Sequence, residues 1–340
     1  MPYVDHADKN LSPVEGYDLI GDVHGCATTL ERLLQKLGYS KIQNVYQHPK
    51  RRVVFLGDII DRGPRIREAL WLVHDMVQKG SALMVLGNHE FNAITYCTKV
   101  KDAALIDASN GDNHYLRPHT PGHNRQIVET LEQFANYPDE WKELIDWFKT
   151  QPLFMQLGDP ELGNSFRMVH ACWDHELIHE HQARFGSGHF DDDFIHETAQ
   201  TNSLSARTKQ RLISGVAIKL PQGMRVRSSD GYERSSFRTK FWSQQAQTYG
   251  ELLFQPDPLP KELAREKISH DHRLQMVNYS LEEPPLFVGH YWLRGQPKPI
   301  THNVACLDYS AVKYGRLVAY RMDGEQQLNS KNFVWVYVDP

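Results

Sequence analysis

Three short motifs, each directly behind an apolar run, constrain the fold of this chain more than any other feature. The motifs are Gly-Asp-Val-His-Gly at 21–25, Gly-Asp-Ile-Ile-Asp-Arg-Gly at 57–63 and Gly-Asn-His-Glu at 87–90. The runs before them are Tyr17–Ile20, Val53–Leu56 and Leu83–Leu86. Such runs predict strands, and in open α/β sheets functional groups gather outside the carboxyl ends of strands. We therefore expect the three motifs to meet in one crevice.

Helical patterns separate these predicted strands. Leucines recur at helical spacing over 30–37, and a second apolar pattern over 69–77 follows Pro64, a residue type that is favoured at the start of a helix. Alternating strands and helices indicate a parallel or mixed sheet with right-handed crossovers. The sequence therefore predicts an α/β fold.

The rest of the chain has a less regular pattern. The segment from about 100 to 150 is predicted to be a helical insertion, and residues 174–285 to be an irregular insertion or lid. Between and after them, strand patterns at Phe166–Val169 and Leu286–Val288 lead to His170 and His290. No Pro/Gly/Ser-rich linker divides the 340 residues, so we expect a single domain over 1–340.

Within the second insertion, residues 205–240 carry nine Lys/Arg against two acids. Taken alone, such a stretch is a solvated surface. Beside a phosphate site it can instead form a basic wall or lid, and both interpretations stay open here.

Charge and hydropathy exclude several classes of partner. The net charge of −4 gives no field that favours nucleic acid or an anionic membrane. The first ten residues are polar, no apolar run approaches the roughly 20 residues of a membrane span, and the four cysteines are scattered. We expect a cytoplasmic protein that binds neither nucleic acid nor membranes.

Six side chains in or near the motifs form a candidate metal centre: Asp22, His24, Asp58, Asn88, His170 and His290. In an extended Asp-x-His pair both side chains face alike, so Asp22 and His24 can chelate one ion, while the two oxygens of Asp58 can bridge two. Mixed nitrogen and oxygen ligands suit manganese, iron or zinc. One motif alone would also fit a turn or a helix cap. Three in order favour two divalent or trivalent metal ions.

Three further residues of the motifs fit the chemistry of phosphate transfer. Two ions about 3.5–4 Å apart activate water and clamp phosphoryl oxygens. His89 is then the candidate proton donor to the leaving group, and Asp61 can fix its tautomer. Arg62 can offer two parallel N–H groups to phosphate oxygens. Four histidines are thus candidate site residues, namely His24, His89, His170 and His290. The other histidines are predicted to lie on the surface.

These motifs resemble those of the calcineurin-like metallophosphoesterases, and within them the phosphoprotein phosphatase family and its bacterial branch of protein phosphatases and diadenosine tetraphosphatases. The resemblance is specific over 17–92, 166–173 and 286–322. It implies a two-sheet β-sandwich flanked by α-helices, with a binuclear metal centre at one edge.

The resemblance also implies how the candidate residues divide their roles. Asp22, His24 and Asp58 would hold one ion, and Asp58, Asn88, His170 and His290 the other. His89, paired with Asp61, would be the general acid and Arg62 a phosphate clamp. The chain departs from the family where Tyr291 and Trp292 follow the last histidine. A second phosphate-binding arginine has no recognisable motif, and Arg234 and Arg238 are the candidates.

The expected activity is that of a metal-dependent phosphomonoesterase which attacks phosphorus with a metal-bridging hydroxide and forms no covalent intermediate. Its expected substrate is a phosphorylated protein or a small phosphate ester. Aromatic residues at the mouth, namely Tyr291, Trp292 and Tyr309, would favour aryl esters such as phosphotyrosine by stacking. The enzymatic alternative is a symmetrical dinucleoside tetraphosphate hydrolase. The non-enzymatic alternative is an inactive scaffold on the same fold.

Overall fold

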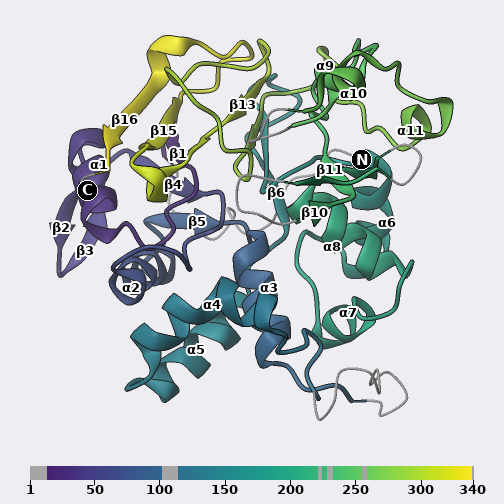
Figure 1. Cartoon of the computed structure of the whole chain (residues 1–340). Helices are drawn as coiled ribbons and strands as arrows, with labels where there is room; N and C mark the ends of the chain where they lie inside the picture. The colour runs from purple at the N-terminus through teal and green to yellow at the C-terminus, as the bar shows by residue number, and fades with distance from the viewer. Residues whose placement is uncertain (1–13, 102–113, 221–223, 228–232, 255–258, 339–340) are drawn as a thin grey trace.

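In the computed structural model, two β-sheets pack face to face and helices cover their outer faces (Figure 1). The structure describes residues 14–101, 114–220, 224–227, 233–254 and 259–338. The first ten residues, whose polarity entered the expectation of a cytoplasmic protein, lie outside these ranges. Within the described ranges, no helix has both the length and the apolar composition to cross a membrane.

The first sheet contains the strands that were predicted in front of the motifs. Its order is β14 (Asp308–Tyr309), β15 (Arg316–Met322), β1 (Gly16–Ile20), β4 (Arg51–Phe55) and β5 (Ala82–Met84), with β16 (Phe333–Tyr337) also paired to β15. Strands β1, β4 and β5 are parallel, whereas β15 runs antiparallel to β1. The carboxyl ends of the three parallel strands therefore share one edge.

The second sheet supplies the two later histidines. Its order is β13 (Val304–Cys306), β12 (Leu286–Val288), β7 (Phe166–Val169) and β6 (Phe154–Leu157). Strands β7, β12 and β13 are parallel, and β6 is antiparallel to β7. His170 thus follows β7 directly, and His290 follows β12 after one glycine.

Side-chain alternation along the strands builds two cores. In β4, Val54 belongs to the core between the sheets, while Val53 and Phe55 face the core under the helices. Helices α1 (Ala27–Leu37) and α2 (Ile66–Gln78) bury their apolar stripes in that second core. Both sheets are therefore mixed and both are buried on two faces, as the two-sheet expectation required.

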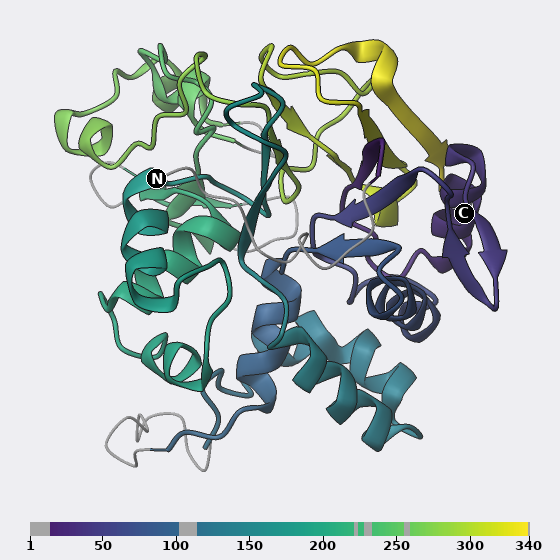
Figure 2. The same ribbon diagram turned by 180° about the vertical axis from the view of Figure 1, so that it is seen from behind.

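Both predicted insertions contain helices, which Figure 2 shows from behind. The first region holds α4 (Pro121–Phe134) and α5 (Pro138–Phe148), which follow α3 (Asn88–Cys97); residues 102–113 of this prediction lie outside the described ranges. The second region holds α6 (His175–Phe185), α7 (Asp192–Glu197), α8 (Leu204–Ser214), α9 (Tyr249–Leu252), α10 (Lys261–Arg265) and α11 (His270–Leu274). We propose that both are insertions into a single domain.

Short hairpins and 3-10 turns complete the fold. They are β2 (Ser40–Ile42) with β3 (Val45–Gln47), β8 (Ala217–Lys219) with β11 (Ser236–Arg238), β9 (Val226–Arg227) with β10 (Glu233–Arg234), η5 (Ala311–Lys313) and η6 (Ser330–Asn332). One histidine corrects the expectation that unassigned histidines lie on the surface. His181 of α6 is fully buried against Phe154, Phe185 and Phe194.

Candidate metal centre

The loops after the strands hold functional residues in an unusual backbone conformation. His24, Asp58, Asp61, Arg62 and His290 have φ values of 42°, 54°, 68°, 69° and 65°. A left-handed backbone costs a non-glycine residue about 1–3 kcal/mol and persists only where the surroundings enforce it. Of the ten non-glycine residues with positive φ in the described part of the chain, these five lie together in the loops after the strands, which makes this edge of the sheets a candidate site.

Glu90, in the first turn of α3, holds the most strained of these loops in place. Its buried carboxylate accepts the backbone N–H groups of Asp58 at 2.8 Å, Ile59 at 2.7 Å and Gly87 at 3.0 Å. A Cβ atom on Gly87 would lie 2.2 Å from Asp58 Oδ1, so only glycine fits there. Glu90 was not among the predicted site residues, although an acid at the third position of a helix is a recognised capping signal.

Two groups of possible metal ligands share the carboxylate of Asp58. One group is His24, Asp58 and His89, the other Asp58, His170 and His290, and the ligand atoms of each lie within 4.8 Å of one another. Asp58 Oδ2 is 3.3 Å from His170 Nε2 and 3.8 Å from His24 Nε2. This central position is the one that a bridging carboxylate requires.

Three of the histidine rings are oriented by backbone carbonyls. The contacts are His24 Nδ1 to Ile60 O at 2.8 Å, His170 Nδ1 to Leu56 O at 2.6 Å, and His290 Nε2 to Ser214 O at 3.0 Å. Because a carbonyl oxygen only accepts, each of these nitrogens carries a proton, and in the neutral ring the lone pair is then on the other nitrogen. Outer hydrogen bonds of this kind orient metal-binding imidazoles.

Buried oxygen atoms without a donor fit the same interpretation. Among the described residues, Asn88 Oδ1 and Asp308 Oδ2 have no hydrogen-bond partner. The carboxylate of Asp22 accepts the backbone N–H of His290 at 3.2 and 3.3 Å but belongs to neither histidine group. Since buried polar atoms are normally satisfied, these oxygens fit a bound cation. Asp308 was not predicted, because one acid after a strand carries no signal of its own.

The carboxylates differ in how readily they ionise. Burial, with the charges of Asp308 and Asp58, raises the pKa of Asp22 well above its usual range. Burial also opposes the charge on Asp58, but the imidazoles of His170 and His89 outweigh it and hold the pKa of Asp58 well below the usual range. A cluster of buried acids around an ionised Asp58 favours a cation at the centre.

The imidazoles at either end of the centre are held neutral. Burial, followed by the charge of Arg62, lowers the pKa of His24 well below its usual range. Burial, followed by the charge of Arg238, does the same for His290. A metal ion binds only the neutral imidazole, so both rings have the protonation state of a ligand.

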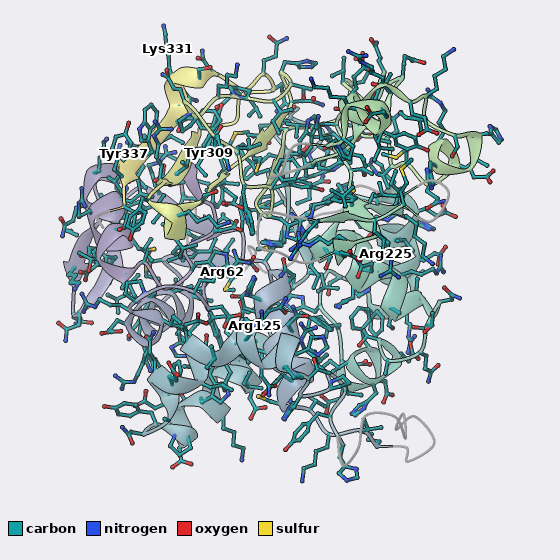
Figure 3. The ribbon with its side chains drawn as sticks, viewed as in Figure 1. Arg62, Arg125, Arg225, Tyr309, Lys331 and Tyr337 are labelled. Atoms are coloured by element: carbon teal, nitrogen blue, oxygen red, sulfur yellow. The ribbon has the colours of Figure 1, made fainter. Side chains whose placement is uncertain are left out.

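The predicted acid pair is assembled. His89 Nδ1 lies 2.5 Å from Asp61 Oδ2, and both residues are buried. Arg62 directs its two terminal nitrogens at this end of the site, 3.0 Å from His89 Nε2 and 3.2 Å from His24 Nε2. Figure 3 shows Arg62 in the middle of the molecule, between the purple and yellow strands and the green helices.

The other four predicted substrate-binding residues are placed differently from one another. Arg238 donates to the carbonyl of His290 at 2.7 Å and lines a cavity of about 280 Å³ with Arg234 and Trp292. Trp292 is partly exposed, with the guanidinium carbon of Arg62 5.0 Å from its ring centre. Tyr291 is fully buried, so it lies behind the site rather than at the expected mouth.

Two mixed sheets with outer helices, and a histidine–aspartate centre at their common edge, define a metallophosphoesterase, the class of hydrolases that act on phosphoric ester or anhydride bonds. A family model of calcineurin-like phosphoesterases matches residues 18–210. The chain belongs to that family, and the resemblance drawn from the three motifs is confirmed.

The two curated relatives described here match only part of this sequence, and this chain spans about a third to a half of their own length. The asymmetrical bis(5'-nucleosyl)-tetraphosphatase PrpE of Halalkalibacterium halodurans is 49% identical over 74 residues, 22% of this chain and 30% of that protein. The protein of the same name from Geobacillus sp. WCH70 is 41% identical over 155 residues, 43% and 54% of the two chains. A cold-active protein-tyrosine phosphatase of a Shewanella species aligns at 16% identity over 99% of this chain and 86% of that one, with a TM-score of 0.45.

Proposed function

We propose that this protein hydrolyses phosphate esters or anhydrides by direct attack of water on phosphorus, without a covalent phosphoenzyme. The observation that carries the proposal is the shared position of Asp58 between two histidine groups. Two ions of manganese, iron or zinc would be held there, by Asp22, His24 and Asp58 and by Asp58, Asn88, His170 and His290. When bound, such ions lower the pKa of a water molecule and neutralise phosphoryl oxygens.

The remaining residues would bind the phosphate and supply a proton. Arg62 and Arg238 lie beside different ligands of the proposed centre. Arg62 contacts the ring of His24, and Arg238 contacts the backbone carbonyl of His290. Each guanidinium can donate two parallel hydrogen bonds to phosphate oxygens. His89, held by Asp61, would protonate the leaving oxygen.

The first candidate substrate is an aryl phosphomonoester such as phosphotyrosine in a protein. Trp292 supports it, because its partly exposed ring lies beside Arg62 and can stack on an aryl leaving group. The buried Tyr291 would act indirectly, by packing against Phe254 and under the guanidinium of Arg238, 5.6 Å from the ring centre.

The second candidate is a dinucleoside polyphosphate hydrolase. Its support is the name of the two relatives above and the basic character of the cavities that share Trp292. Arg234 and Arg238 line one of them, and Arg294, Lys313 and Arg316 line the other. No acidic side chain of the described residues lines either cavity.

Rates on two substrates separate these candidates. The manganese-loaded protein is assayed with 4-nitrophenyl phosphate and with diadenosine tetraphosphate, and the nucleotide products are identified. Faster hydrolysis of the aryl ester supports the phosphomonoesterase. Faster hydrolysis of the dinucleotide supports the anhydride hydrolase, with two ADP for symmetrical cleavage and AMP with ATP for asymmetrical cleavage. If the protein hydrolyses neither substrate, the proposal is contradicted and an inactive scaffold is favoured.

A further inference from the structure

A second cavity shares Trp292 with the cavity that Arg238 lines. Its volume is about 340 Å³, within the range of sites for small molecules, which is about 300–1,000 Å³. It is formed by the segment after Trp292, by the turn η5 and by the sheet residues Tyr309, Arg316 and Tyr337. Figure 3 shows Tyr309 and Tyr337 on the C-terminal strands, to one side of Arg62.

The lining of this cavity combines cations with aromatic rings. Arg294, Lys313 and Arg316 provide positive charge. The rings are those of Trp292, Tyr309, Tyr314 and Tyr337, and no acid of the described residues takes part. A ligand that satisfies both features is an aromatic group that carries several negative charges.

Two hydrogen bonds hold the guanidinium of Arg316, which lines this cavity. One of its terminal nitrogens donates to the carbonyl of Gly295 and the other to the hydroxyl of Tyr337 at 3.1 Å. Its Nε atom is buried and has no hydrogen-bond partner in the described part of the chain. The positive charge of Arg316 is thus fixed beside the cavity, where it favours an anionic ligand.

The cavity adjoins the metal centre through two neighbouring pairs of residues. Lys313 Nζ lies 3.9 Å from the ring centre of Trp292, the same ring that Arg62 approaches. Tyr309 follows Asp308, whose carboxylate accepts the backbone N–H of Ser310 at 2.9 Å. A substrate whose scissile phosphate contacts Arg62 can therefore extend past Trp292 into the cavity.

We propose that this cavity binds the leaving group of the substrate and that this group is a nucleoside polyphosphate. The proposal rests on the proposed function of the metal centre. The base would stack on the tyrosine and tryptophan rings, and the phosphates beyond the scissile bond would pair with Lys313 and Arg316. The tyrosine of a phosphopeptide carries no such charge beyond its scissile phosphate.

The reaction that this arrangement serves is balanced without any further reactant. Water adds its hydroxyl to the scissile phosphorus, and the bond from phosphorus to the leaving oxygen breaks. His89 gives a proton to that oxygen and regains one from the proton that water releases. The nucleoside polyphosphate is then released from the cavity.

Calorimetric titration of the full-length protein, with manganese in excess, tests the proposal. The probes are ATP, inorganic triphosphate, adenosine and inorganic phosphate. We expect ATP to bind at least about tenfold more tightly than triphosphate or adenosine, because only ATP offers both ring and charge. Lys313→Ala is expected to lower the affinity for ATP about tenfold, because it removes one charge-assisted hydrogen bond. It is expected to change the affinity for inorganic phosphate less than about twofold. Lys331→Ala, an exposed lysine of the same C-terminal region (Figure 3), is the matched control.

Two results would overturn the proposal: ATP binding no tighter than triphosphate, or equal effects of Lys313→Ala and Lys331→Ala. An acidic phosphotyrosine peptide that binds more tightly than ATP, and loses affinity in Lys313→Ala, would assign the cavity to a peptide instead. Failure of the proposed function is a separate result, since it appears as absent metal-dependent hydrolysis of both 4-nitrophenyl phosphate and diadenosine tetraphosphate.

Discussion

His89 Nδ1 and Asp61 Oδ2 lie 2.5 Å apart, and a third residue fixes the geometry of this pair. Thr130 of α4 donates its hydroxyl to Asp61 Oδ1 at 2.5 Å and accepts the backbone N–H of Asp61 at 3.1 Å. The carboxylate is thus held from both sides, with one oxygen for the hydroxyl and one for the imidazole. Helix α4, in the first of the two proposed insertions, therefore sets the orientation of the proposed acid.

Replacing Thr130 by valine removes that hydroxyl at almost constant volume. We expect kcat for phenyl phosphate to fall about tenfold, on the scale of a mispositioned acid, with a small change in KM and recovery in Thr130→Ser. Because a good leaving group needs less protonation, 2,4-dinitrophenyl phosphate should lose less activity than phenyl phosphate. Equal losses on the two esters would assign Thr130 a purely structural role.

Glu90→Gln tests the carboxylate that holds the strained loop. The glutamine offers one acceptor oxygen where the glutamate offers two to the N–H groups of Asp58, Ile59 and Gly87. Hydrogen bonds to a charged group contribute about 1.5–3 kcal/mol each. We expect the free energy of unfolding to fall by about 2–4 kcal/mol, measured by urea denaturation, together with weaker metal binding. An unchanged urea midpoint would show that the loop holds its conformation without Glu90.

Much of the fold and the centre could be predicted because each motif combines local chemistry with a strand in front of it. Phe166–Val169 and Leu286–Val288 are strands with the predicted boundaries. The side chains that follow β1, β4 and β5 meet because parallel strands end at one edge. The orienting carbonyls of Ile60, Leu56 and Ser214 could not be predicted, since any residue type supplies a carbonyl.

Other parts depend on contacts distant in sequence. Thr130 forms a hydrogen bond with Asp61, which is 69 residues away in the sequence. No local sequence pattern predicts that contact. Tyr291 and Trp292 are adjacent and aromatic, yet one is buried and the other partly exposed. The path of the backbone after His290 determines which of the two rings is buried, and residue type alone does not predict it.

The two arginines proposed to bind phosphate can be tested against a third that lies away from the site. We expect Arg62→Ala and Arg238→Ala each to raise the inhibition constant of inorganic phosphate about tenfold or more, because each removes two charge-assisted hydrogen bonds. Arg225 is exposed and pairs with Glu233 at 3.7 Å, so Arg225→Ala should leave this constant unchanged. Arg238→Ala with wild-type phosphate inhibition would remove Arg238 from the proposed clamp.

His181 predicts how stability depends on pH. Burial among phenylalanines lowers its pKa from 6.5 to about 4. Between these values the unfolded chain binds a proton that the native state does not, so stability falls as pH decreases from 6.5 to 4 and this contribution is constant below. The loss is at most about 3 kcal/mol. His181→Gln should flatten this part of the pH profile in urea denaturation, whereas His179→Gln, exposed on the same helix, should not. Equal profiles for all three proteins would contradict the assignment.

The central claim is a binuclear metal centre served by His89 as the acid. Its most direct measurement is hydrolysis of an aryl phosphate and of diadenosine tetraphosphate after chelation and after return of manganese, with bound metal counted in the wild type and in His89→Asn. We predict about two ions per chain in both proteins, activity restored by metal in the wild type, and a loss of about 10²-fold or more in His89→Asn. Activity that survives chelation, or His89→Asn at the wild-type rate with two ions bound, would contradict the account.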